Sequence, residues 1–322
     1  MKACVVQELS GPSGLVYTDV DDVTGSDDTV VIDVGAAGAC FPDLLLSKGE
    51  YQLKLPPPFI PGMEAVGVVR SAPEGSEFNV GDRVSAFGVL GGYAEQLVAP
   101  VANVIRSPAE LDDAEAVSLL VNYNTMYFAL ARRAAMRPGD TVLVLGAAGG
   151  VGTAAIQVAR AMGAGIVIAM VHRAGATEFV ESLGADLVLP LSDGWAQVVR
   201  DHTDGRGVDI VVDPVGGRAF DEAIRVLAID GKLLVVGFAA GTIPTVKVNQ
   251  LLLRNIGVLG VAWGEYLNQV SGSAALFASG LGQLVSSGLK PPPPRRYPLS
   301  EGRAALQNLA DGGVFGKVVL EP

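Results

Sequence analysis

The sequence has 322 residues, of which 49% are hydrophobic and 18% are charged, a composition that fits a globular protein and excludes a disordered chain. Its formal net charge of −11 repels nucleic acid and anionic lipid, so we expect neither as a partner. The two cysteines, Cys4 and Cys40, are too few for a disulfide framework, and no apolar run reaches the roughly 18 residues of a spanning helix. We therefore expect a cytoplasmic protein without membrane insertion.

Residues 1–118 form a β-rich region. Short β-branched runs separated by turn residues predict strands in the segments 29–34, 65–69, 79–84 and 91–98. Their spacing is typical of a small barrel or sandwich. At roughly 100–200 residues per domain, this region accounts for one of two expected domains.

The pattern changes after this region. Residues 111–136 are rich in Ala and Leu without Gly or Pro, and they predict a helix that ends at a turn over 137–140. Strands and helices then alternate, with strands expected at 141–145, 166–171, 187–189, 209–212, 232–236 and 256–261. Continuous apolar strands alternating with helices predict a doubly wound α/β domain with a parallel sheet. In the tail, residues 272–287 suggest a helix and 315–320 a closing strand.

The segment that best indicates a ligand is VLVLGAAGGVGTAAI, residues 142–156, in which an apolar strand enters a glycine turn that opens a helix. Ala147, Gly149 and Gly152 hold the spacing of a dinucleotide fingerprint, with Ala in place of its first glycine. We expect position 147 to make the tight turn, Gly149 to admit the pyrophosphate, and Gly152 to let helix and strand pack closely. Gly150 and Val151 complete the helix start, whose free N–H groups attract phosphate.

The end of the second strand of this domain indicates which cofactor binds. An NAD site carries an acidic residue there, whereas this chain has His172 and Arg173. A guanidinium binds a 2′-phosphate, and such a contact contributes roughly 1.5–3 kcal/mol. The sequence therefore favours NADPH over NADH. The alternative is that both are ordinary loop residues.

Several further motifs accompany the fingerprint, namely CFPD at 40–43, PGMEAVG at 61–67, NVGDRV at 79–84, GGYAE at 91–95, DIVVDPVGG at 209–217 and GKVVL at 316–320. With these motifs the chain resembles the medium-chain dehydrogenase/reductase family over its whole length, and within it the zinc-independent quinone oxidoreductases. The resemblance implies a GroES-like, β-rich catalytic domain formed by residues 1–118 and 262–322. It implies a Rossmann domain that binds NADP over residues 119–261.

Zinc alcohol dehydrogenases of that family hold their catalytic metal with two cysteines and a histidine. The matching positions here are Cys40, Met63 and a place near Val121. A catalytic zinc needs three protein ligands, which these side chains do not supply, so we expect no metal. Alcohol oxidation then lacks its Lewis acid, whereas hydride reduction of a quinone or enone by NADPH remains feasible.

The resemblance places the acceptor between the domains, over the nicotinamide. Tyr51 is our candidate donor to the oxyanion that develops on the acceptor, against the alternative of a surface aromatic. Cys40 is a second candidate catalytic residue, with packing as the favoured alternative. The expected pocket lining consists of Phe41, Asp43, Met63, Tyr123 and Trp263.

Candidate cofactor residues are spread along the second domain. Asn122 and Thr125 suit the carboxamide or ribose of the cofactor, with Asn122 also a candidate catalytic residue; the alternative is helix capping and packing. The remaining candidates follow strands or match family positions, and they are Pro214, Gly237, Phe238 and Asn249. The alternative for Asn249 is a helix cap.

Relatives often carry Arg shortly before the final Gly-Lys, where it reaches the 2′-phosphate. Gly313 holds that place here, so we expect Lys317 or Arg173 to compensate.

Two alternatives to a quinone reductase remain open. A double-bond reductase for enoyl or alkenal substrates uses the same scaffold, and a structural or regulatory nucleotide-binding protein needs no catalytic side chain. We also expect a homodimer, because the apolar strand at 256–261 would otherwise leave an exposed sheet edge.

Overall fold

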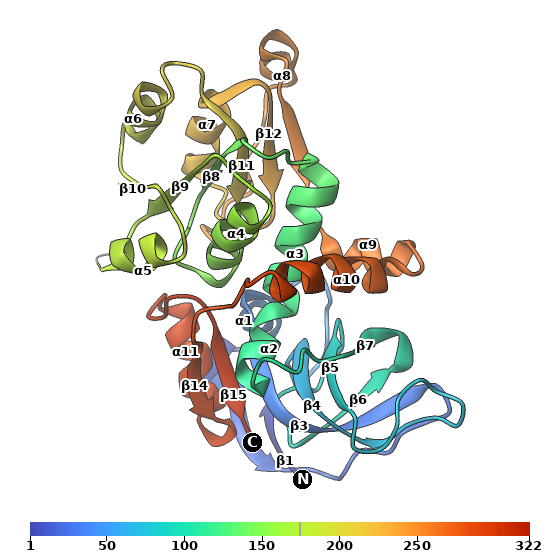
Figure 1. Ribbon diagram of the computed structural model, residues 1–322. Helices are drawn as coiled ribbons and strands as arrows, with labels where there is room; N and C mark the ends of the chain where they lie inside the picture. Colours follow the sequence, from blue (N-terminus) through green and yellow to red (C-terminus); the bar gives the residue numbers. More distant parts are fainter. Residues whose placement is uncertain (174) are drawn as a thin grey trace. The chain divides into compact units, whose positions relative to one another are not determined.

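The computed structural model describes residues 1–173 and 175–322, which divide into two units (Figure 1). Unit 1 contains Met1–Val121 and Pro291–Pro322, and unit 2 contains Asn122–Lys290. The sequence predicted a first domain of 1–118 and 262–322. The structure differs in that residues 262–290 belong to unit 2.

A seven-stranded sheet forms the frame of unit 1, with the order β14-β15-β3-β4-β5-β7 and β6 paired to β3. Its strands are β3 (Thr29–Ala39), β4 (Glu64–Ser71), β5 (Arg83–Phe87), β6 (Gln96–Pro100), β7 (Val104–Arg106), β14 (Arg295–Pro298) and β15 (Val318–Glu321). A separate antiparallel pair is formed by β1 (Lys2–Val6) and β2 (Leu15–Asp19). The helices are α1 (Phe41–Ser47), α2 (Asp113–Leu119) and α11 (Gly302–Ala310), with 3₁₀ turns η1 (Gly11–Gly14), η2 (Val101–Asn103) and η4 (Leu299–Glu301).

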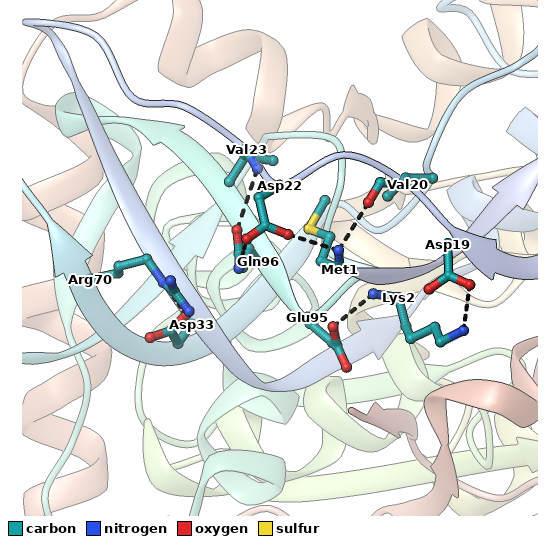
Figure 2. A network of polar contacts seen from close by, with 10 residues as sticks. All are labelled: Met1, Lys2, Asp19, Val20, Asp22, Val23, Asp33, Arg70, Glu95 and Gln96. Atoms are coloured by element: carbon teal, nitrogen blue, oxygen red, sulfur yellow. Dashed lines mark hydrogen bonds and ion pairs between the residues drawn. The ribbon is translucent and has the colours of Figure 1, made fainter.

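Polar contacts tie the β1–β2 pair to the larger sheet (Figure 2). The backbone N–H of Lys2 donates to the Glu95 carboxylate at 2.7 Å, and the Lys2 ammonium binds Asp19 across the pair at 2.7 Å. The Val23 N–H donates to the amide oxygen of Gln96 on β6 at 3.3 Å. These exposed and half-buried contacts orient the strands, while the buried apolar side chains supply most of the stabilisation.

Unit 2 contains a six-stranded parallel sheet with the order β10-β9-β8-β11-β12-β13. Its strands are β8 (Thr141–Val144), β9 (Ile166–Val171), β10 (Leu187–Pro190), β11 (Val208–Asp213), β12 (Leu227–Val235) and β13 (Gly257–Gly260). The connecting helices are α4 (Gly150–Ala161), α5 (Ala176–Ser182), α6 (Trp195–His202), α7 (Arg218–Arg225) and α8 (Val248–Arg254) (Figure 1). The predicted doubly wound parallel sheet is confirmed, and its connections diverge between β8 and β11, where ligands of such folds bind.

The long helix expected at 111–136 is interrupted. It consists of α2, α3 (Val121–Tyr127) and η3 (Phe128–Ala134), a π-helical segment. The break falls at Leu120, whose ψ of −81° departs from helical geometry. Amino-acid propensity alone did not indicate this break, because Leu favours a helix.

Aromatic packing explains why residues 262–290 belong to unit 2. They form α9 (Trp263–Gln269) and α10 (Ser273–Ser286). The ring of Tyr266 lies 4.8 Å from that of Phe128, and the ring of Phe277 lies 5.3 Å from it. Phe128 is buried in unit 2, so these contacts hold both helices there.

Among the described residues, no helix combines the length and apolar character needed to cross a bilayer.

Candidate functional site

The fingerprint turn lies at the carboxyl end of β8. Gly146 adopts a left-handed conformation with φ of 59°, and the Ala147 N–H donates to the Met170 carbonyl of β9 at 3.1 Å. The tight turn is therefore made by Gly146, which corrects the expectation for Ala147. Ala147 is fully buried and helps to fix the turn against β9.

Gly149 and Gly152 lie in different surroundings, so a side chain would meet different obstacles at each position. A β-carbon on Gly152 would lie 2.4 Å from the Gly146 carbonyl oxygen, so a side chain there displaces backbone. On Gly149 its nearest neighbour is that same oxygen at 3.5 Å, an ordinary contact. The backbone at Gly149 (φ −81°, ψ 173°) suits any L-residue. Packing therefore requires glycine at 152, whereas at 149 the space is open.

α4 begins directly after this turn and has no side-chain cap. By contrast, Asp112 caps α2 by accepting the Glu115 N–H at 2.8 Å. The first N–H groups of α4 include those of Gly150, Val151 and Gly152, at the positive end of the helix dipole. An uncapped helix start beside an open glycine suits a phosphate group.

Arg173 follows β9 and lies beside the same turn. One of its guanidinium nitrogens approaches the Ala148 carbonyl oxygen at 3.4 Å. Burial lowers the pKa of Arg173, yet an arginine remains charged at neutral pH. His172 is exposed next to it. The turn thus has a cation close by in a protein whose net charge is negative.

Asp213, at the end of β11, is a site residue to which the sequence analysis assigned no role. It is fully buried, and its Oδ1 accepts the N–H groups of Val215 and Gly216 at 2.8 and 2.7 Å. Its Oδ2 has no hydrogen-bond partner among the described residues. Burial raises the pKa of Asp213 more than these two N–H groups lower it. The signal available in the sequence was an acidic residue at the end of an otherwise apolar strand.

Asp213 shapes a loop that binds the loop after β12. The Ala239 N–H donates to the Pro214 carbonyl at 3.1 Å, and the Ala240 N–H donates to the Val215 carbonyl at 2.9 Å. Pro214, Gly237 and Phe238 therefore lie in two joined loops at the carboxyl ends of adjacent strands. Asn249 is exposed on α8.

Helix α3 carries three of the predicted residues. Asn122 is buried and Thr125 is half-buried. The Tyr123 hydroxyl donates to Gln157 of α4, whose amide group donates to the Lys290 carbonyl at 3.0 Å. Tyr123 is only 2% exposed, and its hydroxyl fastens α3 to α4, so its place in a pocket lining stays a prediction. Trp263, another predicted lining residue, is buried at the start of α9.

In unit 1 a buried polar cluster gathers Cys40, Asp43, Glu64, Tyr93 and Lys317. The Lys317 ammonium donates to Cys40 Sγ at 3.0 Å and also binds Glu64 Oε1. Cys40 Sγ in turn donates to Glu64 Oε1 at 3.0 Å. Burial and the neighbouring Glu64 raise the pKa of the Cys40 thiol.

These contacts bear on two predictions. A buried thiol held between Lys317 and Glu64 is poorly placed to act as a nucleophile, which favours the packing alternative already preferred for Cys40. Lys317 is 6% exposed and its ammonium is used by Glu64 and Cys40. It therefore does not compensate for the missing 2′-phosphate arginine, which leaves Arg173 as the remaining candidate.

Asp43 anchors the start of α1. Its Oδ2 accepts the Cys40 N–H at 2.8 Å and the Tyr93 hydroxyl at 3.2 Å, and its Oδ1 accepts the Gly62 N–H at 3.0 Å. Asp43 is fully buried and its oxygens are used by these groups, so its place in a pocket lining stays a prediction. Phe41 is 39% exposed, and Tyr51 and Met63 are half-buried. These three residues keep accessible surface.

The positions that match zinc ligands in the family are occupied by other interactions. Cys40 contacts Lys317, and the Val121 N–H donates to Glu64 Oε2 at 2.7 Å. Within residues 1–173 and 175–322, no three His, Cys, Asp or Glu side chains are grouped as metal ligands. Of the three family positions, only Cys40 carries a side chain that commonly binds zinc, because Met63 is a thioether and Val121 is aliphatic.

The Asp43 carboxyl makes stability depend on pH. Burial raises its pKa from 3.8 to about 6, so the folded protein binds this proton more tightly than the unfolded chain does. The resulting stabilisation is complete below about pH 4 and is lost as pH rises through 6. We expect the free energy of unfolding of the wild type, relative to Asp43→Asn, to fall by about 2 kcal/mol between pH 4 and pH 7. Denaturant titrations at several pH values measure this difference, and a constant or rising difference would contradict the assignment.

Two family models match the chain. The alcohol dehydrogenase GroES-like domain matches residues 26–109, and the zinc-binding dehydrogenase model matches residues 150–279. Among relatives, quinone oxidoreductase-like protein 2 of Bos taurus is 37% identical over 83% of this chain and 77% of that protein. A 2-haloacrylate reductase of Burkholderia is 30% identical over 99% of this chain and 98% of that protein.

Two solved structures of oxidoreductases are similar to this chain over its whole length. A "probable oxidoreductase" from Mycobacterium abscessus has a TM-score of 0.93 at 59% identity, covering 100% of this chain and 99% of that one. The quinone oxidoreductase of Thermus thermophilus, solved alone and with NADPH, has a TM-score of 0.83 at 36% identity, with full coverage of both chains. The chain belongs to the medium-chain dehydrogenase/reductase family of oxidoreductases and is similar to its quinone oxidoreductases.

Proposed function

We propose that this protein is an NADPH-dependent oxidoreductase that reduces a quinone or a related electron-poor acceptor without zinc. The observation that carries the proposal is the fingerprint turn at the switch point of the parallel sheet. There, the open position at Gly149 adjoins the uncapped start of α4. The Thermus thermophilus relative, whose structure holds NADPH, supports the same cofactor for this chain.

The cofactor and the protein have separate tasks in this proposal. NADPH supplies the hydride when bound. The N–H groups at the start of α4 hold its diphosphate, and Arg173 binds its 2′-phosphate. The ribose and nicotinamide of NADPH are oriented by Asn122, Thr125, Asn249 and the joined loops after β11 and β12.

Tyr51 is the proposed donor to the oxygen that gains charge on the acceptor. A phenol is a hydrogen-bond donor at neutral pH, and the half-buried Tyr51 keeps accessible surface. Phe41 and Met63 supply apolar surface for a flat substrate. The cytoplasm is the proposed location, because Cys4 and Cys40 are both free thiols, which suits a reducing compartment.

A second candidate is reduction of an activated carbon–carbon double bond. It is favoured by the similarity to the 2-haloacrylate reductase over 99% of this chain. Steady-state oxidation of NADPH with a naphthoquinone and with an α,β-unsaturated ketone separates the two. We expect kcat/KM to be at least tenfold higher for the quinone. The reverse order would favour the second candidate, and NADPH binding without turnover of either would favour a regulatory protein.

Arg173 provides a sharper test of cofactor preference. Since a charge-assisted contact contributes roughly 1.5–3 kcal/mol, Arg173→Ala should raise KM for NADPH tenfold to a hundredfold and leave KM for NADH unchanged. Arg132→Ala, on an exposed arginine of the same unit, serves as the control. An equal loss with both nucleotides would contradict a contact to the 2′-phosphate.

The edge of the parallel sheet supports a homodimer. β13 pairs with β12 on one side and is the last strand of its sheet, with Val258 and Leu259 half-buried. An apolar edge strand of this kind is normally paired or covered. Light scattering at micromolar concentration should give twice the chain mass of 33.1 kDa. A mass of one chain at that concentration would exclude the dimer.

A further inference from the structure

The Glu64 side chain links three segments of unit 1 that are distant in sequence. Glu64 begins β4, is fully buried, and reaches Lys317, which immediately precedes β15. Its other oxygen, Oε2, accepts the Val121 N–H at 2.7 Å. Val121 is the last residue of unit 1 and the first residue of α3.

The neighbouring backbone is fitted to this carboxylate. A β-carbon on Gly38 of β3 would lie 2.3 Å from Glu64 Oε1, so glycine is required there for the side chain to fit. Gly38 pairs with Val319 of β15, which brings Lys317 to the same place. Strand β3 therefore leaves room for the Glu64 carboxylate at Gly38, and the neighbouring strand β15 brings the Lys317 ammonium to it.

The contact to Val121 falls where the helix is broken. The ψ of −81° at Leu120 ends α2, so Val121 begins a new helix. A carboxylate that accepts an N–H at a helix start both satisfies a free donor and interacts favourably with the helix dipole. Asn122 and Thr125 lie one and four residues further along α3.

We propose that Lys317 and Glu64 are positioning residues that fix the start of α3 and thereby orient Asn122 and Thr125 toward the cofactor. Lys317 neutralises Glu64 and holds its Oε1, so that Oε2 remains directed at Val121. This inference rests on the proposed function, in which α3 contributes to NADPH binding.

The test combines cofactor affinity with a local readout that needs no turnover. In Lys317→Met, the dissociation constant for NADPH, measured by calorimetry, should rise at least tenfold. Hydrogen exchange of the amides of residues 121–125 should accelerate at least tenfold. Lys317→Arg, which keeps the charge, should restore most of both. Arg70→Met serves as the control, since it removes a cation that pairs with Asp33 across β4 and β3 at the other end of β4.

Three outcomes would overturn the proposal: wild-type affinity in Lys317→Met, weaker binding without faster exchange at 121–125, or the same two effects in Arg70→Met. If Lys317→Met does not fold, Glu64→Gln replaces it, because it keeps the shape while its neutral amide can no longer satisfy both Lys317 and Val121. Unchanged exchange and affinity in Glu64→Gln would also overturn the proposal. Wild-type protein that binds no NADPH would refute the proposed function, whereas the exchange measurement still tests the positioning.

Discussion

The proposed function requires a protein with a net charge of −11 to bind a cofactor that carries several negative charges. The overall field opposes this ligand, so a local arrangement has to hold it. The structure provides such an arrangement within a few residues: a left-handed Gly146, an open Gly149 and an uncapped α4. Backbone N–H groups and a helix dipole supply positive potential without adding charged side chains.

Unit 1 uses its buried charges differently. Asp43 and Glu64 accept backbone N–H groups, and the Lys317 ammonium binds Glu64 directly, so these groups are engaged within the fold. Buried ionic groups contribute little net stability compared with apolar packing, but removing one partner leaves a costly charge behind. Such groups are suited to fixing geometry, which is the role that we propose for Lys317 and Glu64.

The sequence was sufficient to predict the fold class, because continuous apolar strands and a glycine turn are local signals. The start of α4 also followed from local sequence. Contacts between distant segments were not predictable in this way. Lys317 was predicted to be a phosphate ligand because its partner Glu64 is 253 residues away in sequence. Residues 262–290 were assigned to the wrong unit because their aromatic packing on Phe128 produces no periodic pattern in the sequence. Asp213 was missed because its role depends on the turn that it stabilises.

The central claim is that Gly149 is small to admit a diphosphate and not to allow packing. Calorimetric titration of NADPH into Gly149→Val tests it directly, because the backbone there accepts an L-residue and the nearest atom lies 3.5 Å from the added β-carbon. The account predicts a variant with wild-type circular dichroism and thermal midpoint that takes up no NADPH. A folded variant that binds NADPH as tightly as the wild type would contradict it.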